Sequence, residues 1–268
     1  MKARTNALIV VLCLITSLLS VTLAQGTTYT GSLQYTPPRP PDSGDGLFVS
    51  GPDHGGDQWP DKTITFSWTV TDSNVSAPAG YPWEYDYTIQ LSGHQHGFSH
   101  CIIEVSTGTD LLEPFGAEDI VGLTGATIDE IGLLSANQGN STPGMPEDIF
   151  GIKFEPLDEE DEAMQWSWSF FSDRMPTWGD FYVKDGGFQG VMDYAYNYNN
   201  TDGVESGFLH PDSDPSNAPS EGTAGNYYFY HILRPDTASS GNVPEPATLA
   251  LVGTGLLGLL GYLRRRAI

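Results

Sequence analysis

The chain has 268 residues and a formal net charge of −23, with 34 acidic residues against 11 lysines and arginines. This charge argues against a protein that binds nucleic acid or anionic lipid, because like charges repel. Hydrophobic residues make up 39% of the chain, which is enough for a folded core and excludes a wholly disordered protein.

The N-terminal segment has the layout of a secretory signal peptide. Lys2 and Arg4 precede an apolar run over residues 7–19, and small residues precede a predicted cleavage between Ala24 and Gln25. We therefore assign residues 1–24 to a signal helix that engages the Sec translocation machinery. Its removal would take Cys13 away and leave Cys101 without a disulfide partner.

The central part of the chain predicts an all-β domain. Residues 25–62 are rich in Pro and Gly and predict a linker or a loosely packed leading segment. Residues 63–236 contain stretches such as TITFSWTVT and EYDYTIQLS, in which apolar and polar residues alternate. This period of two is typical of half-buried antiparallel strands. At least seven such stretches between turn residues predict an antiparallel β-sandwich of jelly-roll type, in preference to a barrel.

Three histidines in the stretch GHQHGFSH form the most specific metal-site candidate. His94, His96 and His100 are spaced so that neutral imidazoles would bind zinc, copper or nickel. The alternative is a polar hairpin loop over residues 93–98, and spacing alone does not establish a site. We therefore assign no metal to the three histidines.

Other polar clusters give no firmer cofactor assignment. Oxygen ligands for a structural calcium are offered by Asp212, Asp214, the acidic run 158–162 and the stretch NYNNTDGVE over residues 197–205, although none fits an EF-hand. We expect no cofactor, with structural calcium as the alternative.

Aromatic and charged residues later in the domain are open to more than one interpretation. Trp166, Trp168 and Phe170 share one strand face, and this face is either a sugar-stacking platform or, as we prefer, part of the core. Further on, we expect Arg174 to pair with its neighbour Asp173 beside a turn formed by Pro176 and Gly179.

The C-terminal segment predicts a membrane-attached tail. A linker over residues 237–246 carries the motif Val243-Pro244-Glu245-Pro246. Residues 247–263 are apolar and Gly-rich, and as a transmembrane helix of about 25 Å they would be at the short limit for a bilayer core of about 30 Å. The basic tail, residues 264–268, contains Arg264, Arg265 and Arg266, which place this end in the cytoplasm by the positive-inside bias.

This succession of a Pro-Glu-Pro motif, a short helix and terminal arginines resembles the PEP-CTERM sorting signal of Gram-negative bacteria. The resemblance implies that exosortase recognises the tail and cleaves it near Val243-Pro244-Glu245-Pro246. It further implies transient anchoring in the inner membrane with the body outside the cytoplasm, followed by release or transfer to the cell surface or matrix. Exopolysaccharide is the partner that this destination suggests.

No catalytic signature accompanies the sorting signal. The chain has no G-x-S-x-G, no H-E-x-x-H and no P-loop. We therefore expect a non-enzymatic exported protein of the cell surface or extracellular matrix. The alternatives are a carbohydrate-binding or calcium-dependent adhesive module and, less favoured, a matrix-acting glycan hydrolase or lyase.

Overall fold

The computed structural model describes residues 26–37, 46–51, 58–93, 97–108, 113–157, 164–187, 192–197 and 231–239. Residue contacts set Thr27–Ser240 apart as one unit, which we call the body. Among the described residues, no helix has both the length and the apolar character needed to cross a bilayer. The predicted signal helix, residues 1–24, and the predicted transmembrane helix, residues 247–263, lie outside the described residues.

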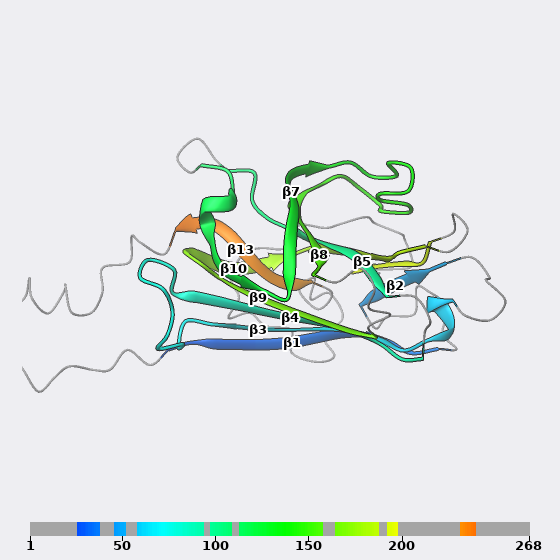
Figure 1. The fold of residues 1–268 in the computed structure, drawn as a ribbon, viewed down its shortest axis with the longest axis horizontal. Coiled ribbons are helices and arrows are strands. Elements are labelled where there is room, and N and C mark those ends of the chain that lie inside the picture. Colours follow the sequence, from blue (N-terminus) through cyan, green and yellow to red (C-terminus); the bar gives the residue numbers. More distant parts are fainter. Residues whose placement is uncertain are drawn as a thin grey trace, which may run out of the picture. The chain divides into compact units, whose positions relative to one another are not determined.

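The body is built from two large antiparallel sheets (Figure 1). Sheet A has the order β1 (Thr28–Tyr35), β3 (Ile64–Thr71), β4 (Trp83–Leu91), β9 (Gln165–Ser172) and β6 (Ile120–Thr124). Sheet B has the order β2 (Leu47–Ser50), β12 (Tyr194–Asn197), β11 (Phe181–Asp185), β5 (Phe98–Glu104), β8 (Ile149–Pro156) and β7 (Ala126–Leu134).

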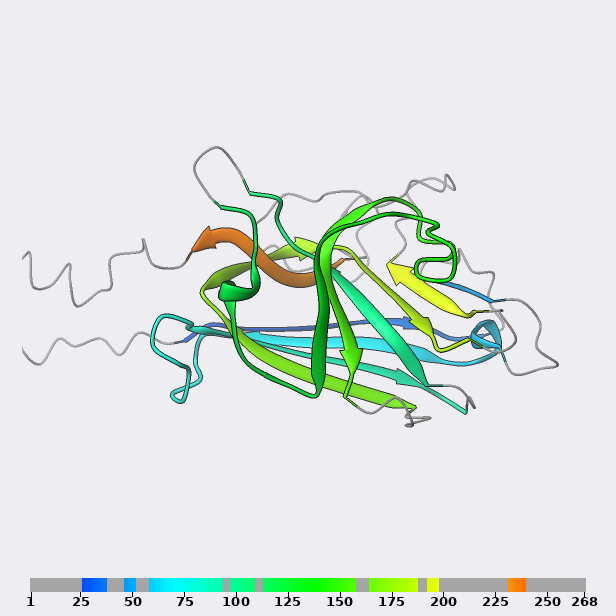
Figure 2. The same ribbon diagram turned by 45° about the horizontal axis from the view of Figure 1, so that its top comes forward.

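Three shorter features complete the body. Strands β10 (Arg174–Gly179) and β13 (Ile232–Ser239) pair as a two-stranded ribbon, where the chain passes from β9 of sheet A to β11 of sheet B. Single 3-10 turns, η1 (Trp59–Asp61) and η2 (Ala117–Asp119), precede β3 and β6. Figure 2 shows the two layers after a 45° turn.

The core lies between the two sheets and is rich in aromatic side chains. In β3 and β4 the burial alternates residue by residue, so one side of each strand faces the interior. Phe66 of sheet A meets Phe181 of sheet B at a ring-centroid distance of 4.3 Å, and Phe170 meets Phe154 at 5.7 Å. Rings at these distances bury large apolar areas across the interface. The predicted all-β sandwich is therefore confirmed, while its jelly-roll connectivity stays a prediction.

A second, smaller core covers the outer side of sheet B. Ile102, Tyr182 and Ile149 point away from the main core and pack with Met145, which belongs to the connection between β7 and β8. The Tyr182 hydroxyl donates to the Pro143 carbonyl at 2.7 Å. Sheet B is thus buried on both faces here, which explains why all seven residues of β5 except Ser99 are buried.

The prediction of a loosely packed segment over residues 25–62 is wrong for β1 and β2. Strand β1 pairs with β3 along its whole length, and Leu33 and Tyr35 are buried. The Pro- and Gly-rich composition hid this strand from sequence reasoning. Gly31 is needed within it, because a Cβ there would come within 2.2 Å of the Trp68 ring.

The predicted turn at Pro176 and Gly179 is also wrong. Both residues lie in β10, opposite Pro235 and Ile232 of β13, and the register shifts between Arg174 and Pro176. Proline is tolerated in a strand at such an irregularity, where its missing N–H breaks no regular ladder.

The two ends of the body lie at the same end of the sandwich (Figure 1). Thr28, which begins β1, is opposite Thr71, and this row of sheet A continues through Glu84 to Phe171. Ser239, which ends β13, is opposite Arg174, only three positions after Phe171.

Candidate functional site

The structure buries the one predicted metal-binding histidine that it describes. His100 in β5 is 2% exposed, and its ring lies 6.2 Å from that of Tyr182. Burial lowers the pKa of His100 to about 3, with smaller contributions from Lys184 and Lys153, so its imidazole is neutral near pH 7.

The remaining predicted ligands lie outside the described residues. They are His94 and His96, the calcium candidates Asp212 and Asp214, and the acidic run 158–162; of the run 197–205 only Asn197 is described. Within the described ranges, no group of three or more His, Cys, Asp or Glu side chains is arranged to hold a metal ion. The three-histidine candidate, to which we assigned no metal, and the alternative of a structural calcium are therefore untested as complete sites.

The aromatic stripe of β9 belongs to the core. Trp166, Trp168 and Phe170 are 6%, 2% and 0% exposed. Trp168 packs against Tyr87 of β4 at 5.4 Å and against Phe154 of sheet B at 5.7 Å. A sugar has no access to faces packed in this way, so the preferred core interpretation is confirmed.

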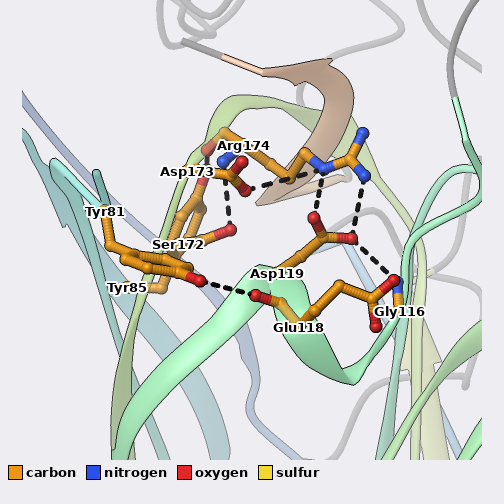
Figure 3. Close-up of polar contacts among 8 residues, drawn as sticks. All are labelled: Tyr81, Tyr85, Gly116, Glu118, Asp119, Ser172, Asp173 and Arg174. Atoms are coloured by element: carbon orange, nitrogen blue, oxygen red, sulfur yellow. Dashed lines mark hydrogen bonds and ion pairs between the residues drawn. The ribbon is translucent and has the colours of Figure 1, made fainter. Parts of the chain in front are cut away.

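A buried ion pair lies where β9 passes into β10 (Figure 3). The Arg174 guanidinium donates to both carboxylate oxygens of Asp119, at 2.9 and 2.8 Å, and both side chains are less than 10% exposed. Gly116 N–H donates to the same carboxylate at 2.8 Å. This bidentate pair fixes η2 against the junction of β9 and β10.

Neighbouring groups complete the surroundings of this pair. Tyr85 donates its hydroxyl to the Arg174 carbonyl at 2.9 Å, and Asp173 lies 3.7 Å from Arg174 Nε. Burial and then the nearby Asp119 raise the pKa of Asp173, while Arg174 opposes the shift. The expected pairing of Asp173 with Arg174 is therefore present but secondary to Asp119, which sequence reasoning missed.

A second buried polar cluster surrounds Asp180, the residue between β10 and β11. Asn197 donates to Asp180 at 2.6 Å, and His231 Nε2 lies 3.4 Å from the same Asp180 oxygen. Glu104 accepts from the Asp180 N–H at 2.9 Å and lies 3.4 Å from Arg234. These contacts connect β5, β12 and β13 to Asp180, which lies between β10 and β11. They therefore stabilise the packing of these strands.

The outer face of sheet A differs from both clusters because it is accessible. In three successive rows across the sheet its side chains are exposed or half-buried. The rows are Thr30, Thr69, Asp86, Ser169 and Thr124; then Ser32, Ser67, Thr88 and Ser167; then Gln34, Thr65, Gln90 and Gln165. We call these residues the hydroxyl face. Asp86 is its one charged side chain.

Hydrogen bonds between strands order part of the hydroxyl face. The hydroxyls of Thr88 and Ser167 are 2.8 Å apart, and those of Thr124 and Ser169 are 3.0 Å apart. Ser67 donates to the Thr88 carbonyl at 3.3 Å. Sequence reasoning found the alternation in β3, β4 and β9, but it did not assemble the face, because strand order and register set which residues are neighbours.

Comparison with known protein families gives a match at the C-terminus. Residues 242–266 match the family model of the PEP-CTERM protein-sorting motif. The chain carries a PEP-CTERM sorting motif. No curated protein and no solved structure matches the chain. The PEP-CTERM motif implies an exported protein that is anchored in the membrane transiently and is processed by an exosortase.

The individual residues of the predicted processing sites are not described by the structure. Val243, Pro244, Glu245, Pro246 and the arginines Arg264, Arg265 and Arg266 lie within the matched segment, and all are outside the described residues. Ala24 and Gln25, which flank the predicted signal cleavage, are outside them as well.

Proposed function

We propose that this PEP-CTERM protein is a non-enzymatic component of the cell surface or extracellular matrix, delivered there by its tail. The observation that carries the proposal is the sorting motif over residues 242–266. After signal-peptide removal at Ala24–Gln25, the body crosses the inner membrane through the Sec machinery and is held there by residues 247–263. Exosortase then cuts near Val243–Pro246 and frees the body from its anchor.

The position of β13 supports an intact body after cleavage. Strand β13 ends at Ser239, so residues 240–242 separate the last strand from Val243. Ile232 and Leu233 of β13 are fully or almost fully buried, and Leu233 accepts a hydrogen bond from the Tyr87 hydroxyl at 2.8 Å. Cleavage after residue 242 therefore removes none of these contacts.

The buried polar groups support a structural role for the body. The two carboxylate oxygens of Asp119 are engaged by Arg174 and Gly116, and those of Glu104 by Asp180 and Arg234. These bonded carboxylates hold the segments that connect the two sheets. Their role is therefore to stabilise the fold.

The test is a Glu245→Ala substitution in cells that contain the processing enzyme. We expect the unprocessed chain to accumulate in the membrane fraction, because the motif no longer fits the enzyme. Glu130→Ala, an exposed glutamate in the body, is the matched control and should be processed as the wild type. Normal processing of Glu245→Ala would contradict the proposal.

A further inference from the structure

The connection between β3 and β4 holds an apolar side chain entirely in solvent. We call residues 73–82, with the sequence SNVSAPAGYP, the β3–β4 loop; it contains no charged residue. Val75 in this loop is 101% exposed, compared with 62% for Leu133 in β7. Pro78 and Ala79 of the same loop are exposed as well. The tip of the loop is therefore uncharged and in part apolar.

Hydrogen bonds within the loop fix the position of Val75. The Asn74 side chain accepts from the Ser76 N–H at 2.8 Å, and the Asn74 carbonyl accepts from the Ala77 N–H at 3.1 Å. The Asn74 amide also donates to Glu84 of β4 at 2.7 Å. The loop thus presents Val75 in an ordered turn. Single exposed apolar residues are common on protein surfaces, so the location of the turn decides its meaning.

The loop adjoins the place where the chain enters the body. The Asp72 N–H donates to the Thr27 carbonyl at 3.1 Å, and the Asp72 carboxylate accepts from the Thr27 N–H. Strand β1 begins with the next residue, Thr28, which is opposite Thr71 at the end of β3. The loop therefore starts directly beside the N-terminal end of the body.

A second set of contacts connects the loop to the end of β13. The Tyr81 hydroxyl donates to the Glu118 carbonyl at 2.9 Å (Figure 3). The next residue of η2, Asp119, forms the buried ion pair with Arg174. Arg174 is in turn opposite Ser239, the last residue of β13. The loop is therefore connected to the end of the body from which the sorting tail continues.

We propose that the β3–β4 loop inserts Val75 into the lipid surface while the tail still anchors the protein. Seven residues, 240–246, separate Ser239 from the predicted transmembrane segment 247–263, and fully extended they reach at most about 25 Å. The end of the body that carries the loop is thus held close to lipid until the tail is cut. The inference rests on the anchoring that is part of the proposed function.

The anchor makes a single apolar side chain sufficient for this contact. Moving a valine side chain out of water favours the inserted state by only about tenfold, which would not hold a free protein on a membrane. An anchored body is already at high local concentration beside the lipid, so a weak contact is populated. Asp72, Glu84 and Glu118 belong to the same end, and their carboxylates favour neutral over anionic lipid headgroups.

The experiment measures the depth of the loop with the tail-bearing protein, purified from cells that lack the processing enzyme. The protein is reconstituted in phosphatidylcholine vesicles that contain nitroxide-labelled lipid as a quencher. An environment-sensitive dye is attached to Ala79→Cys in a Cys13→Ala background; Cys101 is fully buried and stays unlabelled. We expect the dye emission to shift to the blue and to be quenched by the labelled lipid.

A dye at Ser141→Cys is the positional control. Ser141 is exposed and belongs to the connection between β7 and β8, which lies toward the opposite end of the sandwich (Figure 1). We expect neither a blue shift nor quenching at this position. Equal quenching at positions 79 and 141 would show that the body lies on the lipid without a preferred end, which would overturn the inference.

The deciding variant is Val75→Asp with the dye kept at position 79. We expect the inserted fraction to fall at least about tenfold, because a carboxylate replaces the one side chain that favours insertion. The matched control is Leu133→Asp, which replaces an exposed apolar residue of β7 and should leave quenching at position 79 unchanged. Circular dichroism melting verifies that both variants fold.

Three further results would overturn the inference. They are no quenching at position 79 while the chain stays with the vesicles, equal losses in Val75→Asp and Leu133→Asp, and stronger quenching when phosphatidylglycerol replaces phosphatidylcholine. Each of them leaves the anchoring by the tail intact. A chain that does not sediment with the vesicles would instead contradict the anchoring and the inference together.

Discussion

On its inner face, sheet A carries Trp68, Tyr87 and Trp168, and on its outer face the same three strands carry Ser67, Thr88 and Ser167. The inner rings are at most 4% exposed, whereas the outer side chains are exposed or half-buried. In each strand, every second residue therefore packs in the core and stabilises the fold. The residues between them form the accessible surface. We therefore expect substitutions at neighbouring residues of one strand to alter the core and the surface separately.

The largest expected effect comes from the inner face. Trp168→Ala should lower the free energy of unfolding by about 3–5 kcal/mol, because it opens a cavity between Tyr87 and Phe154. Ser167→Ala, its neighbour on the outer face, should change the same quantity by at most about 0.5 kcal/mol. Urea unfolding followed by tryptophan fluorescence measures both, and similar losses would contradict the division between the faces.

The buried Arg174–Asp119 ion pair can be compared with an exposed ion pair of the same protein. Asp119→Ala should lower the free energy of unfolding by about 3 kcal/mol, because it removes the carboxylate that accepts two hydrogen bonds from the buried Arg174 guanidinium. Asp129→Ala removes one of the two carboxylates that pair with Lys153, an aspartate that is 46% exposed, and it should cost less than about 1 kcal/mol. Chemical unfolding measures the free energy of unfolding of both variants. Equal losses would contradict a structural role for the Arg174–Asp119 pair.

His100 makes the covered outer side of sheet B sensitive to acid. Its folded-state pKa of about 3 lies below the unfolded value near 6.5, so the unfolded chain binds the proton first. Stability should fall as the pH drops from 6.5 toward 3, by up to about 1.4 kcal/mol per pH unit from this group. The difference between wild type and His100→Gln isolates this contribution from that of the carboxylates. A difference independent of pH would contradict it.

The smallest effect belongs to Asp86, the one carboxylate of the hydroxyl face. Partial burial and the nearby Glu84 raise its pKa, and a hydrogen bond from Ser169 opposes the shift. Its ionised form is thus disfavoured in the folded state, and stability is lost as the pH rises through the raised pKa. Asp86→Asn should therefore stabilise the protein at pH 7 by about a few tenths of a kcal/mol. A lower melting temperature of Asp86→Asn than of the wild type at pH 7 would contradict this prediction.

The sequence predicts most of sheet A because each central strand has one buried and one accessible face. The alternation of apolar and polar residues in β3, β4 and β9 can therefore be recognised in each strand without knowledge of its neighbouring strands. Strand β1 was missed because Gly31 interrupts its apolar side, and β10 was missed because Pro176 and Gly179 are ordinarily turn residues. Strand β1 packs its Gly31 against Trp68 of β3, and β10 pairs with β13. Both partners are distant in the sequence, so the local pattern does not predict them.

The sites differ in the same way. The sorting motif is a continuous stretch, so it was predicted from residues 243–266 and confirmed by the family match. Arg174 and its partner Asp119 are 55 residues apart, and no local spacing connects them. The hydroxyl face requires the order and register of five strands, and it emerges only from the folded sheet.

The central claim, that the tail delivers the body and is then removed, is tested most directly by one measurement. The intact mass of the mature protein isolated from its own cells locates both ends of the chain. We predict a chain that begins at Gln25 and ends close to Val243–Pro246, without residues 247–268. A mature protein that retains Arg264, Arg265 and Arg266 would contradict the claim.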